Sequence, residues 1–371
     1  MIETFTFSQH ASKAPPHWLR LLERTCVLWP MATLLLLVFS GCGDLGGPGN
    51  GEDPAFAIYL AADTSTKIWD LPAEDLTTLD LSDTPLLTSS DLRLYDFSAH
   101  VMYLRDHRSD ILPYSSGRES FFLDSWCHRP FLIMAHDVPL YAGQFSCSVS
   151  SLIGAMVPEF SDLSGCMYPI NTLHIDWDWH TPDLEDPRRN EYVRAALMDA
   201  GVFRAGISVR LDSLSSSNDD DLSIVEYTFT LTNNDIDDLF VPDPELMGDA
   251  LYHYFTNGLV IHNLETGESL GRVNRSADFG LGITRWRESW YTRVPSGTSI
   301  TRTTVVDAIE QLTPGEYLAT MIYQAPATVP AFRVFRNGGR VWLGDVLSEP
   351  VGLSIGGGGE VTLGVNDTPR M

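Results

Sequence analysis

Side chains alternate between apolar and polar with a period of two from Phe203 onward, and this pattern constrains the fold more than any other feature. Such alternation is typical of strands whose sheet has one face in the core and one face in water. This half of the chain is therefore predicted to be nearly all strand. Two successive segments carry the pattern: Ala205, Ile207, Val209 and Leu211 against Gly206, Ser208, Arg210 and Asp212, then Val225, Tyr227, Phe229 and Leu231 against Glu226, Thr228, Thr230 and Thr232.

Further apolar runs bounded by turn residues supply enough strands for two packed sheets. We therefore predict a β-sandwich domain over residues 203–366, followed by a tail at 367–371. The runs lie at 259–262, 283–293, 299–306, 317–323, 332–335 and 351–355.

The first half of the folded part, residues 54–202, is predicted to be an α+β domain. Short strands are expected at 55–60, 101–104, 131–135 and 140–145. One helix is well marked, because Asp186 can cap it and Pro187 suits its first position. An apolar stripe from Val193 to Ala200 continues this helix, and Gly201 ends it.

Three resemblances bear on these domains. The residues Leu312-Thr313-Pro314-Gly315-Glu316-Tyr317, followed by Trp342-Leu343-Gly344 and Ser348, are similar to the late strands of bacterial immunoglobulin-like domains. That resemblance implies an immunoglobulin-like sandwich in which the tyrosine packs in a corner. Arg129-Pro130-Phe131-Leu132-Ile133-Met134, the turn at Asp137 and Leu140-Tyr141 resemble the periplasmic head of the SecD translocase subunit, a multi-spanning family. As a whole the chain resembles uncharacterised two-domain envelope lipoproteins of bacteria, which implies no activity.

The amino-terminal segment has the composition of an export signal. Its apolar run from Cys26 to Phe39 follows Arg20 and Arg24 and is shorter than the ~20 apolar residues that a membrane-spanning helix needs. Ser40-Gly41-Cys42 resembles the lipobox of bacterial lipoprotein precursors, with Phe39 where leucine is usual. The resemblance implies a lipoprotein signal peptide over residues 1–41 and acylation (palmitate) of Cys42. An ordinary cleaved signal is the alternative, and residues 42–53 are a glycine-rich flexible linker in either case.

These features predict an exported protein of the bacterial cell envelope or periplasm, held by an N-terminal lipid as its membrane anchor. Asp44 lies two residues after Cys42, so the choice between inner and outer membrane stays open. The formal net charge of −25 disfavours nucleic acid as a partner and makes the lipid the expected membrane contact. An envelope protein or a glycan is the expected binding partner.

The cysteines of the exported part suggest one disulfide in an oxidising compartment. Cys147 and Cys166 flank a loop-like stretch and are the favoured pair. Cys127, next to His128, is expected to be buried, free or paired instead. None of the three lies in a Cys-x-x-Cys unit, which disfavours zinc and redox chemistry.

Metal-ligand residue types cluster in the segment from His174 to His180. As a strand, this segment places His174, Asp176, Asp178 and His180 on one face and Ile175, Trp177 and Trp179 on the other. His174 and His180 are then roughly 20 Å apart, so only neighbours such as Asp176 and Asp178 could share an ion. The favoured interpretation is a sheet with an aromatic core face. A sugar-stacking platform of exposed Trp177 and Trp179 is the alternative.

Two further acidic turns offer oxygen ligands for calcium, at Asp219 and Asp221 and at Asp235 and Asp237. Neither stretch fits an EF-hand loop. Hairpin turns explain both, since Asn and Asp favour turn conformations.

No catalytic residue is assigned from the sequence, because the common hydrolase and phosphate-binding motifs are missing from it. His100, His136 or His253 could still join a site assembled from distant residues. We therefore expect a non-enzymatic binding or assembly module without a cofactor. The alternatives are a glycan- or calcium-binding lipoprotein and a hydrolase with a dispersed active site.

Overall fold

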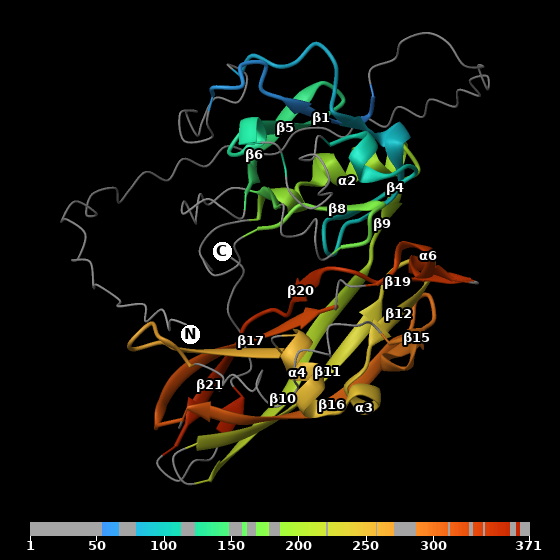
Figure 1. Ribbon diagram of the computed structural model, residues 1–371. Coiled ribbons are helices and arrows are strands. Elements are labelled where there is room, and N and C mark those ends of the chain that lie inside the picture. The colour runs from blue at the N-terminus through green and yellow to red at the C-terminus, as the bar shows by residue number, and fades with distance from the viewer. Residues whose placement is uncertain are drawn as a thin grey trace, which may run out of the picture. The chain divides into compact units, whose positions relative to one another are not determined.

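The computed structural model of this chain is rich in β-structure, with several sheets and a few short helices (Figure 1). The prediction of a β-rich fold is therefore confirmed. Residues Glu52–Met371 form one compact unit. The structure describes residues 54–66, 79–112, 122, 124–147, 158–161, 168–177, 186–219, 222–256, 258–270, 287–310, 312–325, 329–336, 338–356 and 361–363. The predicted signal peptide, the linker and the tail all lie outside these residues.

A five-stranded sheet begins the described fold, in the order β2-β1-β5-β6-β7. All neighbours are antiparallel except β6 and β7, which run parallel. Three of the strands match predicted ones closely. The bounds are β1 Phe56–Leu60, β2 Leu87–Thr88, β5 Pro130–Ala135, β6 Val138–Ser146 and β7 Glu159–Ser161.

A second sheet, in the order β8-β4-β3-β9, contributes side chains to both hydrophobic cores of the protein. Its strands are β3 Leu92–Asp96, β4 Val101–Leu104, β8 Thr172–His174 and β9 Phe203–Arg204. Leu92 packs in the first core, with side chains from residues 56–202, whereas Leu94 packs in the second, with side chains from residues 207–355. Residues two apart would share a face in a regular strand, but the pairing register shifts between them at Arg93. This bulge lets one short strand serve both cores.

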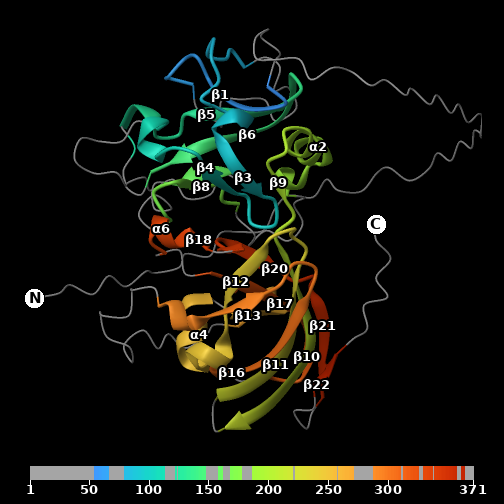
Figure 2. The ribbon, with the colours of Figure 1, turned by 90° about the vertical axis from the view of Figure 1, so that its right-hand side faces the viewer.

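Helix α2, Glu191–Asp199, covers part of the first core and contacts β1, β5 and β9 (Figure 2). Its Val193, Ala196 and Leu197 are buried, as the stripe predicted. The predicted start of this helix is wrong, because a separate 3-10 helix precedes α2. Asp186 and Pro187 begin the 3-10 helix η6, Pro187–Arg189, and Asn190 caps α2 through the backbone N–H of Tyr192. The backbone leaves the helical region at Asn190, so two caps follow each other.

The second half holds three more sheets, in the orders β10-β11-β16, β15-β12-β19-β18 and β14-β13-β17-β21-β22, with β20 paired to β17. Short helices η7, α3, α4 and α6 connect some of their strands. The strand bounds are β10 Ile207–Asp219, β11 Leu222–Asn233, β12 Asp238–Pro242, β13 Gly258–Asn263, β14 Ser269–Leu270, β15 Tyr291–Val294, β16 Ser299–Glu310, β17 Gly315–Gln324, β18 Phe335–Arg336, β19 Gly339–Val341, β20 Asp345–Leu347, β21 Val351–Ile355 and β22 Val361–Leu363. The helices are α3 Pro244–Met247, α4 Asp249–Thr256, α6 Ala331–Val334 and η7 Glu288–Trp290, and the first half adds the 3-10 turns η3 Ser89–Asp91, η4 Arg108–Asp110 and η5 Asp124–Trp126.

The sheet β10-β11-β16 has the predicted inner and outer faces. Val225, Tyr227, Phe229 and Leu231 are buried in the second core. On the outer face, hydroxyl groups pair across β11 and β16, with 2.9 Å between the Oγ1 atoms of Thr228 and Thr303 and of Thr230 and Thr301. The alternation in sequence therefore predicted which side chains of β11 face the core.

Two predicted strands of the second half are wrong in part. Residues 332–335 form the end of helix α6 and the start of β18, because Pro330 precedes a single helical turn that buries Val334. In the run 283–293, residues 283–286 lie outside the described part of the chain, Glu288–Trp290 is a 3-10 helix, and residues 291–293 belong to β15. Both segments are too short for periodicity to separate a helical turn from a strand.

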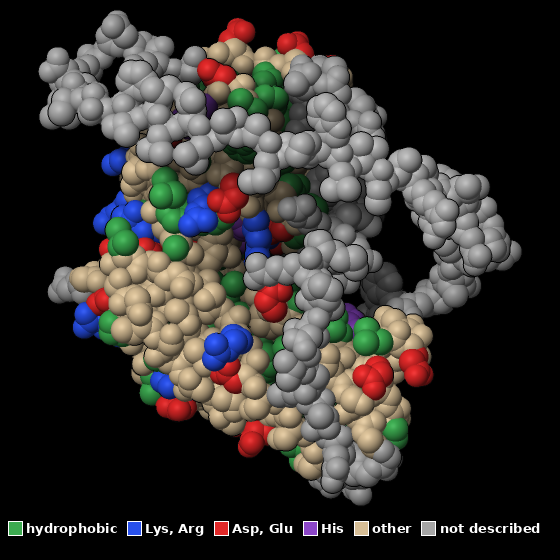
Figure 3. Space-filling view, turned by 180° about the vertical axis from the view of Figure 1, so that it is seen from behind, with side chains coloured by type: hydrophobic (Ala, Val, Ile, Leu, Met, Phe, Trp, Pro, Cys, Tyr) green, Lys and Arg blue, Asp and Glu red, His purple; other side chains and the backbone are tan. Residues whose placement is uncertain are grey.

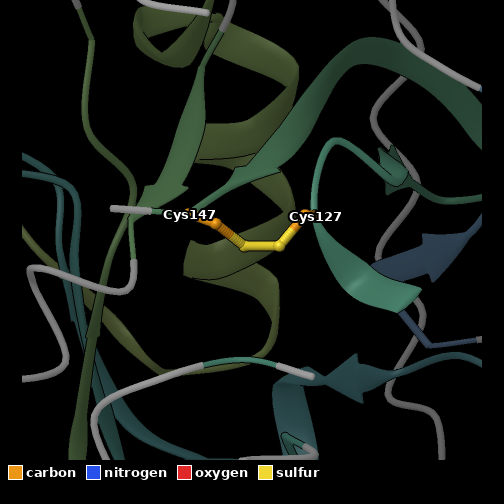
Figure 4. The surroundings of a disulfide bond; sticks show 2 residues. All are labelled: Cys127 and Cys147. Atoms are coloured by element: carbon orange, nitrogen blue, oxygen red, sulfur yellow. A yellow bond between two sulfur atoms is a disulfide. The ribbon is translucent and has the colours of Figure 1, made fainter. Parts of the chain in front are cut away.

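A disulfide joins Cys127 to Cys147 (Figure 4), so the predicted pair of Cys147 with Cys166 is wrong. Cys166 lies outside the described residues. The reason is the register of the hairpin β5-β6, in which Pro130 pairs with Gln144. Continuing that register by three residues on each strand brings Cys127 opposite Cys147, and the backbone N–H of His128 donates to the carbonyl oxygen of Phe145 at 2.7 Å.

Candidate functional site: an arginine-aromatic surface

Four arginines stacked on aromatic rings form a connected group, which we call the arginine-aromatic surface. Its residues come from four places in the sequence: the bulge in β3, strand β12, the start of helix η7, and the turn from α6 into β18. A tertiary arrangement is therefore needed to assemble it. The members are Arg93, Arg287, Arg333 and Arg336, with the rings of Phe240, Trp290, Phe332 and Phe335 and the carboxylate of Glu288.

Each guanidinium lies over a ring. The Arg93 guanidinium is 3.5 Å from the ring centroid of Phe335, and that of Arg336 is 4.6 Å from Phe240. Arg333 lies over Phe332 at 5.4 Å and Arg287 over Trp290 at 5.5 Å. Such cation-π contacts fix the guanidinium plane while leaving the N–H groups at its rim able to bind carboxylate or phosphate oxygens.

Glu288 lies among the arginines and contacts two of them. Its carboxylate oxygens are 3.7 Å from Arg333 and 3.2 Å from Arg336. No carboxylate of the described residues forms an ion pair with Arg93 or Arg287. The surface therefore carries more positive than negative groups, in a chain whose net charge is −25.

Local structure explains why Phe332 and Arg333 point outward, whereas the Arg336 side chain is only 15 % exposed. Val334 is fully buried and holds the single turn of α6 against the second core. The residues on the other side of that turn are then exposed, Phe332 by 78 % and the Arg333 side chain by 51 %. Gly338, at φ +83°, turns the chain from β18 into β19 and fixes the position of Arg336.

In Figure 3, Lys and Arg side chains gather with hydrophobic side chains toward the left edge. Figure 3 is seen from behind, whereas Figure 2 places α6 toward the front of the view in Figure 1, so the arginine-aromatic surface lies mainly on the opposite face and these side chains are a separate group. Further Lys and Arg side chains lie lower on the face seen in Figure 3, among acidic and neutral groups.

Sequence reasoning missed this surface. A signal for it was present in Phe332-Arg333-Val334-Phe335-Arg336, where phenylalanine is followed by arginine twice. Arginine supplies nearly all the basic side chains of this sequence, whose only lysines are Lys13 and Lys67. The contribution of Arg93 could not be seen, because it depends on a bulge far away in the sequence.

The favoured interpretation of the segment at β8 is right for the apolar face and wrong for His174, which is buried at the end of the strand and not on a polar outer face. Ile175 and Trp177 are buried, so Trp177 offers no exposed platform for a sugar. Asp176 accepts the backbone N–H of Trp177 at 2.8 Å and is exposed. Asp178, Trp179 and His180 lie outside the described residues.

Two buried histidines near β8 each face a carboxylate. His174 Nε2 lies 3.7 Å from Asp345 Oδ1 in β20, and His100 Nε2 lies 3.9 Å from Asp186 Oδ2. Burial raises the pKa of Asp345, although His174 opposes that shift. Burial holds the pKa of His100 well below its ordinary range, and repulsion by Arg188 and Arg189 adds to the effect. His100 is therefore kept neutral at physiological pH.

A third histidine, His253 in α4, approaches a hydroxyl group and a carboxylate. Thr304 Oγ1 lies 3.1 Å from His253 Nε2 and donates to Asp249 Oδ1 at 2.6 Å. In a catalytic triad the carboxylate orients the imidazole, but here it binds the hydroxyl. Thr304 is also buried, so the arrangement ties α4 to β16. His136 lies in an exposed turn, with Nε2 3.3 Å from Asp199.

In the acidic turn, Asp235 belongs to a buried ionic cluster, and the partly exposed Asp237 lies at its edge. Arg340 Nη2 donates to Asp235 Oδ2 at 2.7 Å and to Asp96 Oδ2 at 2.6 Å, and Arg204 Nε donates to Asp237 Oδ2 at 3.1 Å. Arginine thus binds the carboxylates proposed as calcium ligands. Asp219 belongs to the end of β10, but its side chain and all of Asp221 lie outside the described residues.

Within the described residues, no group of three His, Cys, Asp or Glu side chains is placed to hold a metal ion. None of the helices in that part of the chain combines the length and the apolar character needed to cross a bilayer. Comparisons of the chain with protein-family models and with curated protein sequences find no match.

Proposed function

We propose that this chain is an exported, lipid-anchored protein of the bacterial cell envelope whose folded body is a non-enzymatic binding module. The anchor is supported by the apolar run from Cys26 to Phe39 and by Ser40-Gly41-Cys42. The binding role is supported by the arginine-aromatic surface. Arginine and aromatic side chains are enriched at protein interfaces and dominate their binding energy.

The proposal includes two domains, an α+β domain at residues 54–202 and an immunoglobulin-like sandwich at 203–366. Two hydrophobic cores divide near this boundary, although β3 and β4 contribute to both. Tyr317 supports the sandwich, because its buried hydroxyl donates to the carbonyl oxygen of Thr313 at 2.8 Å. A tyrosine bonded to backbone a few residues upstream is the corner found in immunoglobulin-like domains.

In-cell photo-crosslinking tests the binding role. A benzoylphenylalanine replaces Phe332 in the full chain, in the bacterium that encodes it, and the matched control replaces Tyr192, an aromatic residue of α2 that is 70 % exposed. We expect defined adducts from position 332 and none from position 192, with mass spectrometry identifying them as protein, lipid or glycan. Equal adducts at the two positions, or none at position 332, would contradict a binding role for this surface.

The anchor has its own test. Cys42→Ser removes the thiol that would carry the lipid, so the precursor should accumulate unprocessed and labelled palmitate should be missing from the protein. Normal processing of this variant would show an ordinary signal peptide instead.

A further inference from the structure

We propose that the arginine-aromatic surface rests on the headgroup layer of an anionic lipid bilayer. This inference depends on the proposed binding role and names its partner. It also revises the expectation that the N-terminal lipid is the sole membrane contact. The net charge of the chain determines how strongly an anionic bilayer repels it at long range. Binding at short range depends instead on the local charge of the surface that touches the bilayer, because salt screens the more distant charges.

The arginines match phospholipid phosphates in charge and geometry. A guanidinium binds two oxygens of a phosphate with parallel N–H groups, and it is more weakly hydrated than an ammonium. Arg93 and Arg287 have no carboxylate partner among the described residues, and Glu288 serves both Arg333 and Arg336. Stacking on Phe335 and Trp290 holds the first two arginines in place before a ligand arrives.

Phe332 favours a bilayer over an acidic protein surface. Its side chain is 78 % exposed, more than any other large hydrophobic side chain of the described residues, and it projects from a single helical turn next to Arg333. An aromatic side chain beside basic ones is the composition of helices that lie at a membrane interface, where the ring enters the boundary between headgroups and acyl chains.

With the proposed lipid anchor, a surface of low intrinsic affinity is sufficient to keep the folded body in contact with the bilayer. A glycine-rich linker of the length of residues 43–53 has a root-mean-square span of roughly 20 Å. The folded body is thereby held close to the bilayer, and a tethered surface binds at a high effective concentration. The chain as a whole has a formal net charge of −25, so we expect an anionic bilayer to be approached through the arginine-aromatic surface, whose arginines outnumber its one carboxylate.

Vesicle flotation tests the inference on a chain that carries no lipid. Residues 43–371 contain the whole compact unit Glu52–Met371 and both cores. The probes are vesicles of phosphatidylglycerol and phosphatidylcholine in the ratio of about one to three, with pure phosphatidylcholine as the neutral comparison. We expect binding to the anionic vesicles and about fivefold weaker partitioning for each arginine removed. Arg93→Gln with Arg333→Gln should therefore weaken binding about 25-fold.

A matched double variant separates this effect from a general change in charge. Arg194→Gln with Arg210→Gln removes the same charge at exposed positions of α2 and β10 and should leave binding unchanged. Phe332→Ser should weaken binding without any change in charge, and unchanged melting temperatures would show that all variants fold. Equal binding to both kinds of vesicle, equal loss in the two double variants, or no binding to anionic vesicles would overturn the inference.

The two proposals fail in different ways. Protein adducts at position 332 together with no vesicle binding would keep the binding module and replace the bilayer by an acidic protein. Lipid adducts at position 332 with vesicle binding would support both proposals. No adducts and no vesicle binding would remove both.

Discussion

His100 shows how a single residue can make folding depend on pH. Its backbone is left-handed, at φ 51°, and its side chain is buried with the Tyr95 hydroxyl 3.2 Å from Nδ1. The native pKa lies well below the ordinary value of 6.5 because of burial and because of Arg188 and Arg189. Below pH 6.5 the unfolded chain therefore binds a proton at this position that the native protein does not bind. Native stability from His100 is present above pH 6.5 and is lost as the pH falls toward the lower native pKa.

His100→Asn should make unfolding less sensitive to acid. Between pH 8 and pH 5 we expect the wild type to lose more stability than the variant, by up to about 1.4 kcal/mol for each pH unit below 6.5. Chemical denaturation at both pH values measures this. Asparagine tolerates the left-handed backbone, and His136→Asn is the control because His136, at φ 45°, shares that conformation while being exposed. An equal pH dependence in wild type and His100→Asn would show that another group is responsible.

At the scale of elements, the hairpin β5-β6 explains the disulfide. The two cysteines flank the strands, and the turn between them has left-handed residues at His136 and Asp137, as in a type I′ turn. Replacing both Cys127 and Cys147 by alanine should destabilise the protein by about 3 kcal/mol, because the bond closes a short loop of the unfolded chain. Unfolding by urea measures the loss. A non-reducing peptide map checks the pairing itself, and a Cys147–Cys166 peptide would contradict it.

The attachment of α4 to β16 supplies a second prediction at this scale. Thr304→Val keeps the side-chain shape but removes the hydroxyl that binds Asp249 and His253. We expect a loss of about 1–3 kcal/mol in the free energy of unfolding, since the buried imidazole of His253 loses its hydrogen bond to the hydroxyl. Thr301→Val on the outer face of the same strand is the control and should change it by less than about 0.5 kcal/mol. Equal effects of the two substitutions would assign no special role to the buried hydroxyl.

At the scale of the whole molecule, Arg340 joins elements of the two cores. Its guanidinium bonds to Asp96 of β3 and to Asp235 after β11, and the Tyr103 hydroxyl accepts from Nη1 at 3.2 Å. Arg340→Met should cost about 3–5 kcal/mol of unfolding free energy, because two buried carboxylates lose their cation. Arg210→Met, at an exposed arginine, is the matched control in the same urea titration. Adding Asp96→Asn and Asp235→Asn should restore part of the loss, and a triple variant as unstable as Arg340→Met would contradict this account.

The sequence by itself determined the β-rich fold, the strands β1, β4, β10, β11 and β21, and the buried stripe of α2. These depend on local periodicity and turn residues, which neighbouring side chains in the sequence display directly. It did not determine where a single helical turn replaces a strand, as at α6, because so short a segment carries no period.

Only the tertiary structure decided the disulfide pairing, the ionic cluster around Arg340 and the arginine-aromatic surface. Each depends on groups that strand register, a bulge or a turn brings together from distant positions, such as Arg93 with Phe335. Asp235 looked like a calcium ligand because its partner Arg340 is far away in the sequence. The sequence specifies the chemical groups of each side chain, whereas the tertiary fold determines which other groups it contacts.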